Sequence, residues 1–121
     1  SSEIKILYVD DELINLMLFE LSFKRYYRIL KASTGLEGLK MLDENPDIRI
    51  TISDMKMPGM NGIEFITTAK ETHPHICYYI LTGFDITQEI ADALERNLIR
   101  KYFRKPFNVN DILQSIAVTC K

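Results

Sequence analysis

Apolar segments of two different periods alternate along the chain, and this alternation limits the fold more than any other feature. Short runs rich in β-branched and aromatic residues, typical of strands, are each followed by a segment whose apolar residues recur at helical spacing. Five such pairs follow one another, and this order predicts an α/β fold with one parallel sheet covered by helices on both faces. The expected strands span residues 4–9, 28–32, 50–54, 76–81 and 99–103, and the expected helices lie near 13–24, 35–45, 61–73, 86–94 and 109–117.

The 121 residues contain no internal repeat and no linker, and they are enough for one hydrophobic core. We therefore expect a single domain over residues 1–121, either complete or cut from a longer protein. The first helix is especially apolar. Its spacing predicts a buried face that consists of Leu13, Leu16, Met17 and Leu21, widened by Phe19 and Phe23.

Acidic residues stand where the first and third strands end. Asp10 and Asp11 follow the first strand, and Asp54 closes the third. A lone aspartate in such a place is more often a turn or helix cap. However, right-handed crossovers and a change of winding direction put the first and third strands side by side, and ligands bind at the carboxyl ends of strands at that point. The three carboxylates are therefore expected to face one another.

Three adjacent carboxylates repel one another, so they must take up protons or share a cation. Mg²⁺ prefers oxygen ligands and commonly combines one or two carboxylates with a phosphate. No histidine or cysteine stands near these acids in the sequence, which argues against zinc or a redox metal. The pattern favours a magnesium site that also handles phosphate.

Two further polar residues are expected at the same edge of the sheet. Thr82 ends the fourth strand and Lys105 follows the fifth, supplying a hydroxyl and an ammonium group. Either residue alone is commonplace at such a position. Together they provide the donors and the positive charge that phosphoryl oxygens require.

Composition narrows the class of partner and the location. Fifteen basic and seventeen acidic residues leave a net charge of −2, so nothing argues for nucleic-acid binding or for attachment to a membrane. No apolar run approaches the ~20 residues of a membrane span. Cys77 and Cys120 lack any metal-binding or CxxC spacing, and we expect ordinary thiols in a reducing cytoplasm.

Four separated motifs resemble the receiver domain of two-component response regulators, in order and over essentially the whole chain. They are DDE at residues 10–12, SDMKMPGMNG at 53–62, LTG at 81–83 and YFRKPF at 102–107. The resemblance, to chemotaxis regulators among others, implies a flavodoxin-like (βα)5 three-layer sandwich with the strand order 2-1-3-4-5. It also implies a phosphorylation-dependent switch rather than an enzyme, which assists its own phosphorylation and dephosphorylation.

The resemblance assigns a role to each matching residue. Asp54 takes a phosphoryl group from a phosphohistidine of a sensor histidine kinase or a phosphotransfer protein. Asp11 and Asp54 bind Mg²⁺ directly, for which Mn²⁺ can substitute, Asp10 binds it through water, and the backbone carbonyl of Lys56 completes the protein ligands. Thr82 hydrogen-bonds one phosphoryl oxygen and Lys105 pairs with another.

The resemblance also implies how phosphorylation changes a binding surface of the domain. Tyr102 matches an aromatic residue that turns inward as Thr82 moves toward the phosphoryl group. This movement changes the face formed by the fourth helix, fifth strand and fifth helix, where an output domain or a second copy binds. The peptide bond between Lys105 and Pro106 matches one that is cis in the family. The side chain of Lys56 stands at the mouth of the site, where it either attracts the phosphodonor or crowds the hydrolytic water.

Two rival functions use the same residues. A haloacid-dehalogenase-like phosphatase also carries a strand-end aspartate and Mg²⁺, but its second aspartate, two positions after the nucleophile, is replaced here by Lys56. Without that general acid, rapid turnover of phosphate esters is not expected. A phosphate-independent interaction module of the same fold usually loses one or more of the five site residues, all of which are present here.

Overall fold

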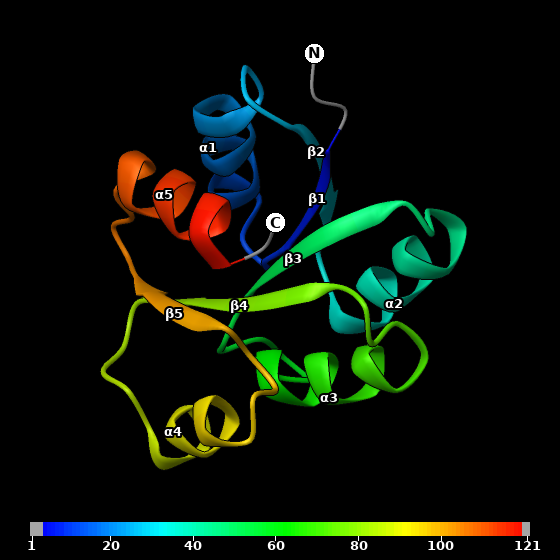
Figure 1. Ribbon diagram of the computed structural model, residues 1–121, viewed down its shortest axis with the longest axis vertical. Coiled ribbons are helices and arrows are strands. Elements are labelled where there is room, and N and C mark those ends of the chain that lie inside the picture. The colour runs from blue at the N-terminus through cyan, green and yellow to red at the C-terminus, as the bar shows by residue number, and fades with distance from the viewer. Residues whose placement is uncertain (1–3, 120–121) are drawn as a thin grey trace.

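Five parallel strands form one sheet in the order β2-β1-β3-β4-β5, as predicted (Figure 1). The computed structural model describes residues 4–119. The strands are β1 (Lys5–Val9), β2 (Arg28–Ala32), β3 (Ile48–Asp54), β4 (Cys77–Thr82) and β5 (Lys101–Arg104). The helices are α1 (Leu13–Phe23), α2 (Gly35–Glu44), α3 (Gly62–Thr72), α4 (Gln88–Glu95) and α5 (Val109–Thr119).

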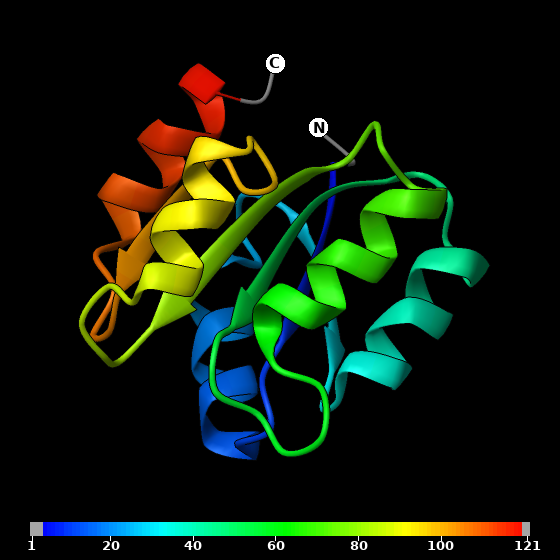
Figure 2. The same ribbon diagram turned by 90° about the horizontal axis from the view of Figure 1, so that it is seen from below.

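Helices cover both faces of the sheet, which makes the expected three-layer sandwich. Helices α1 and α5 lie on one face, and α2, α3 and α4 lie on the other (Figures 1 and 2). Side chains alternate across each strand, so two separate apolar clusters form, one on each face of the sheet. The fold is flavodoxin-like, and its central strands β1, β3 and β4 are almost entirely buried.

Side-chain caps set where four of the helices begin. Thr34 accepts a hydrogen bond from the Glu37 amide at the start of α2, and Asn61 forms a reciprocal capping box with Glu64 at the start of α3. Thr87 caps α4 through the Ile90 amide, and the Asn108 side chain accepts from the Asp111 amide at the start of α5. Each cap fixes where its helix begins, so the chain turns in the segment between the strand end and the cap, where the polar residues lie.

Several boundaries differ from the sequence prediction by one or two residues, and a tertiary hydrogen bond explains the later start of β5. Strand β5 begins at Lys101 instead of residue 99, because the Ile99 amide contacts the Ala93 carbonyl of α4 at 3.4 Å. Helix α4 begins at Gln88, so Ile86 lies before it and is exposed. Strand β3 begins two residues earlier than expected, at Ile48, and α5 ends two residues later, at Thr119. None of these differences changes the topology.

Helix α1 has two apolar faces, and the predicted buried face was partly wrong. Leu16, Phe19 and Phe23 are buried. Five other large apolar side chains are between 51% and 77% exposed, and we call them the outer stripe: Leu13, Ile14, Met17, Leu18 and Leu21. Helical spacing alone cannot choose between two such faces. The aromatic pair wins because Phe19 stacks on the buried Tyr8 of β1, with ring centroids 4.2 Å apart.

The expectation of an ordinary thiol at Cys77 was also wrong, because this buried cysteine of β4 is disulfide-bonded. The only other cysteine in the sequence, Cys120, lies outside the described residues. Sequence spacing carried no signal for this bond, because the two cysteines of the sequence follow no CxxC or other disulfide pattern. Across residues 4–119, no helix is long and apolar enough to cross a membrane.

Candidate functional site

The three predicted acids meet at the carboxyl ends of β1 and β3. Each of Asp10, Asp11 and Asp54 offers a carboxylate oxygen, and these oxygens lie within 4.8 Å of one another. The meeting follows from the register, in which Val9 of β1 pairs with Ser53 of β3. Asp10 is fully buried and Asp54 nearly so, whereas Asp11 is exposed. The cluster therefore consists of two buried carboxylates and one that is exposed to solvent.

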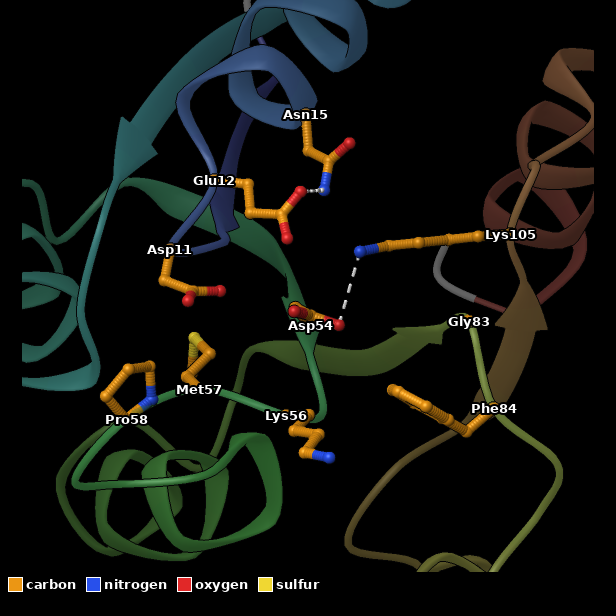
Figure 3. A pocket seen from close by; sticks show the side chains of 10 residues that line it. All are labelled: Asp11, Glu12, Asn15, Asp54, Lys56, Met57, Pro58, Gly83, Phe84 and Lys105. Carbon is orange, nitrogen blue, oxygen red and sulfur yellow. Dashed lines mark hydrogen bonds and ion pairs between the residues drawn. The ribbon is translucent and has the colours of Figure 1, made fainter.

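Lys105 neutralises the buried part of this cluster. Its Nζ lies 3.0 Å from Asp10 Oδ2. The same Nζ lies 3.3 Å from Asp54 Oδ1 (Figure 3). Burial would lower the pKa of Lys105, but the two carboxylates outweigh it and raise that pKa. The backbone amide of Lys105 donates to the Thr82 carbonyl at 2.8 Å, which holds the lysine beside the end of β4. Its peptide bond to Pro106 is cis, as the resemblance implied.

Burial raises the pKa of Asp54 from 3.8 to about 6. Lys105 opposes this rise and the charge of Asp10 adds to it. The Asp54 carboxylate is thus ionised at neutral pH, but it is desolvated and crowded by like charge. Such a group gains from any ligand that brings positive charge to the cluster.

The raised pKa predicts that the metal-free Asp54→Asn variant is more stable than the wild type at pH 7. With a pKa of about 6, the Asp54 carboxyl binds its proton more tightly in the native state than in the unfolded chain. The free energy of unfolding of the wild type therefore falls as the pH rises from about 4 to 6. Two pKa units correspond to about 2–3 kcal/mol. In urea unfolding with EDTA, Asp54→Asn should be more stable than the wild type by this amount at pH 7. The two proteins should become equally stable below pH ~4. A gap that persists in acid contradicts this account.

The loop after Asp54 needs glycine at two places for two different reasons. Gly59 has φ +76°, a backbone conformation that L-residues rarely adopt. Gly62 packs so closely that a Cβ would collide with the backbone carbonyl of Asp54, and its amide donates to the Met55 carbonyl at 2.8 Å. The start of α3 is thereby tied to the end of β3, which holds the loop beside the acids.

The site opens into a pocket whose mouth carries one further cation (Figure 3). The pocket is about 560 Å³ in volume, and the acids and Lys105 form one side of it. Lys56 Nζ lies 5.0 Å from the centre of the Phe84 ring, within the range of a cation–π contact. The ammonium of Lys56 therefore rests on the loop after β4 and forms no ion pair with Asp54.

Thr82 and Tyr102 lie near the site but do not reach the acids. The buried hydroxyl of Thr82 accepts a hydrogen bond from the Phe84 amide at 3.1 Å. Tyr102 of β5 pairs in register with Ile80 and packs, half-buried, against the core below α3 and α4. Thr82 stands at the strand end as predicted, with its hydroxyl bonded to its own loop.

Sequence reasoning missed Tyr8, which also belongs to this site. Its buried hydroxyl donates to Asp10 Oδ2 at 2.7 Å, and its pKa is raised by burial and by the Asp10 charge. Because side chains alternate along a strand, residues 8 and 10 share one face, and that spacing was the available signal. Asn15 of α1 was also missed, and its side chain donates to Glu12 at 3.3 Å.

The donor set fits a hard divalent cation. The cluster offers only carboxylate oxygen atoms, two of its three acids are buried, and Asp11 and Asp54 line the pocket. These features match Mg²⁺, which keeps part of its water shell and binds phosphate oxygens. Asp10, Asp11 and Asp54 are the residues able to hold it, with the repulsion among them relieved by its charge.

Comparisons with known proteins agree with this geometry. The family model of the response regulator receiver domain matches residues 6–117. The chain is 33% identical over 114 residues to sporulation initiation phosphotransferase F of Bacillus subtilis (strain 168), covering 93% of this chain and 90% of that protein. It is 28% identical over 118 residues to chemotaxis protein CheY1 of Helicobacter pylori (strain J99), covering 94% of each.

A solved structure supports the same assignment. A response regulator receiver domain protein from Clostridium thermocellum superposes with a TM-score of 0.86 at 32% identity, covering 94% of this chain and 91% of that one. The chain therefore belongs to the response regulator receiver domain family of two-component systems. Two curated relatives that are transcriptional regulators are much longer, and the chain spans only 23% and 31% of their lengths.

Membership places the protein in a defined class. Receiver domains are signalling modules that interact with sensor kinases or phosphotransfer proteins and with output domains. Phosphorylation on aspartate and Mg²⁺ binding at an acidic pocket are general for this family. This chain carries a cluster of three aspartates, Asp10, Asp11 and Asp54, that could hold such an ion.

Proposed function

We propose that this domain is a phosphorylation-dependent switch in which Asp54 accepts a phosphoryl group from a phosphohistidine. The observation that carries the proposal is the meeting of Asp54, the two acids after β1 and Lys105 at one sheet edge. The nucleophile is ionised at neutral pH, and Lys105 stands 3.3 Å from it, ready to pair with a phosphoryl oxygen. We place this function in a single receiver domain over residues 1–121 and expect it to work in the cytoplasm.

In the transfer, an Asp54 carboxylate oxygen forms a bond to phosphorus. The bond between phosphorus and the histidine nitrogen breaks, and its electron pair stays on the imidazole. Mg²⁺, or Mn²⁺ in its place, supplies charge neutralisation when bound to Asp11, Asp54 and the Lys56 carbonyl, with Asp10 acting through water. Lys105 and the Thr82 hydroxyl then hold phosphoryl oxygens.

The switch begins with a change of partner at Thr82. Its hydroxyl now accepts from the Phe84 amide, so turning toward the phosphoryl group releases the loop after β4. Tyr102 lies on the next strand, two positions before Arg104, which is the register partner of Thr82, and it turns inward into the space that Thr82 leaves. The α4–β5–α5 face then presents a changed surface to an output domain or to a second copy of the chain.

The rival functions are separated by one experiment with acetyl phosphate and Mg²⁺. Intact mass should show a gain of one phosphoryl group, ~80 Da, that hydroxylamine removes as expected for an acyl phosphate. No adduct on the wild type would support the phosphate-independent module. Repeated turnover of p-nitrophenyl phosphate would support the phosphatase, but we expect none because Lys56 stands where that class needs an acid.

The outer stripe of α1 is the surface on which we propose that the phosphohistidine protein rests. The stripe begins at Leu13, two residues after Asp11, so a protein that delivers a phosphoryl group to Asp54 must lie against this end of α1. Exposed apolar side chains in one continuous stripe are typical of a protein-binding surface. Their helical spacing suits packing against another helix.

Replacing Met17 and Leu21 together by glutamine should slow transfer from a phosphorylated histidine phosphotransfer protein about tenfold, because two apolar contacts are lost. The rate with acetyl phosphate should stay unchanged. Leu36→Gln, on α2 and 70% exposed, is the matched control and should alter neither rate. Equal loss with both phosphodonors would show that the damage lies in the site and not in docking.

A further inference from the structure

The buried acceptor Asp10 Oδ2 is shared by two donors of different kinds. Tyr8 donates its hydroxyl at 2.7 Å, and Lys105 donates its ammonium at 3.0 Å. The other oxygen of this carboxylate accepts from the Glu12 amide at 3.0 Å. Asp10 is fully buried, so each of these donors replaces hydrogen bonds that water would otherwise supply.

Tyr8 is fixed in a way that Lys105 is not. Its ring is buried in β1 and stacks on Phe19 of α1 at 4.2 Å, with only 12° between the ring planes. Phe19 in turn contacts Phe107, just beyond Lys105 and Pro106, with ring centroids 5.9 Å apart. The hydroxyl therefore has one position, whereas the ammonium ends a flexible chain that also contacts Asp54.

We propose that Tyr8 is a positioning residue that lets Lys105 leave Asp10 for the phosphoryl group, an inference that rests on the proposed function. When Lys105 turns to the phosphoryl oxygen, Asp10 Oδ2 keeps its bond to the Tyr8 hydroxyl. Among the residues that the structure describes, without that hydroxyl Lys105 is the one side chain left donating to this oxygen, and its departure leaves a buried carboxylate oxygen without a side-chain donor. Tyr8 thus lowers the cost of the step in which Lys105 changes partner.

The test is the rate of labelling by acetyl phosphate as a function of Mg²⁺ concentration for the wild type and Tyr8→Phe. This variant keeps the ring and its stacking on Phe19 and removes only the hydroxyl. The limiting rate at saturating Mg²⁺ should fall about tenfold, the size expected for a lost hydrogen bond to a charged group. An unchanged limiting rate overturns the proposal, even if more Mg²⁺ is needed to reach it.

A double-mutant cycle separates this role from general damage. In the Lys105→Ala background no ammonium has to move from Asp10 to the phosphoryl group. The Tyr8→Phe substitution should therefore change the limiting rate less than about twofold. The same loss in both backgrounds would contradict the proposal. Tyr78→Phe is the matched control, because it removes another buried tyrosine hydroxyl, bonded to the His73 carbonyl at 2.9 Å and remote from the acids.

Tyr78→Phe should leave the labelling rate unchanged, and thermal unfolding of both tyrosine variants shows whether they stay folded. Failure of the wild type to take up any phosphoryl group would instead overturn the proposed function. The two failures are therefore distinct. A wild type that is labelled normally, with Tyr8→Phe labelled as fast, overturns only the role of Tyr8.

Discussion

Asp54→Asn is expected to take up no phosphoryl group from acetyl phosphate, whereas the wild type gains one. The amide that replaces the carboxylate has no nucleophilic oxygen of comparable strength, so the acyl phosphate cannot form. The residue lies in the pocket beside Lys105, at 3.3 Å, and the register of β3 with β1 keeps it there. The expected change is a complete loss of the ~80 Da adduct in intact mass.

A matched control is needed, because the chain carries many other aspartates. Asp92→Asn replaces an exposed aspartate of α4, far from the acidic cluster, and should be labelled as fast as the wild type. An adduct that persists on Asp54→Asn would show that another side chain is the acceptor. Peptide mapping of that adduct would then identify it.

Asp11→Ala is expected to lose the dependence of labelling on Mg²⁺. The Asp11 carboxylate is the exposed member of the three-acid cluster, so the substitution removes a metal ligand and leaves the hydrophobic core unchanged. Labelling should fall to the rate that the wild type shows in EDTA, a loss of roughly a hundredfold or more for a metal that stabilises transferring phosphoryl charge. Mn²⁺ binding followed by electron paramagnetic resonance should weaken in parallel.

Glu12→Ala is the control for this prediction. Glu12 is the next residue, is also exposed and lines the same pocket, but it is not one of the three clustered acids. It should keep a magnesium dependence close to that of the wild type. If Asp11→Ala keeps an unchanged dependence on Mg²⁺, the assignment of Asp11 as a ligand is wrong.

The sequence predicted which residues stand at the strand ends and left open how some of their side chains are oriented. Asp10, Asp11 and Asp54 could be brought together because parallel strands end at one edge. The sequence left open what the Lys56 side chain contacts, and the structure places it on the Phe84 ring. Two loops that are distant in the sequence decide that contact, and no local pattern encodes it.

The first helix shows the same division within the fold. The spacing of apolar residues predicted a helix over 13–24, and α1 spans Leu13–Phe23. The pattern could not tell the core face from the outer stripe, because both are apolar. Stacking of Phe19 on Tyr8 settled the choice, and that contact exists only once the helix lies on the sheet.

The sequence by itself determined the class of fold, the order of the elements and the residues at the strand ends. Alternating periodicity, caps and breakers are local, and a strand that ends in an acid carries that acid to the sheet edge wherever the sheet forms. Only the tertiary structure decided which donors share Asp10 Oδ2, because Tyr8 and Lys105 are 97 positions apart in the sequence and meet through the packing of β1, α1 and the segment after β5. Hydrogen bonds of 2.7 and 3.0 Å depend on side-chain placement that periodicity does not specify.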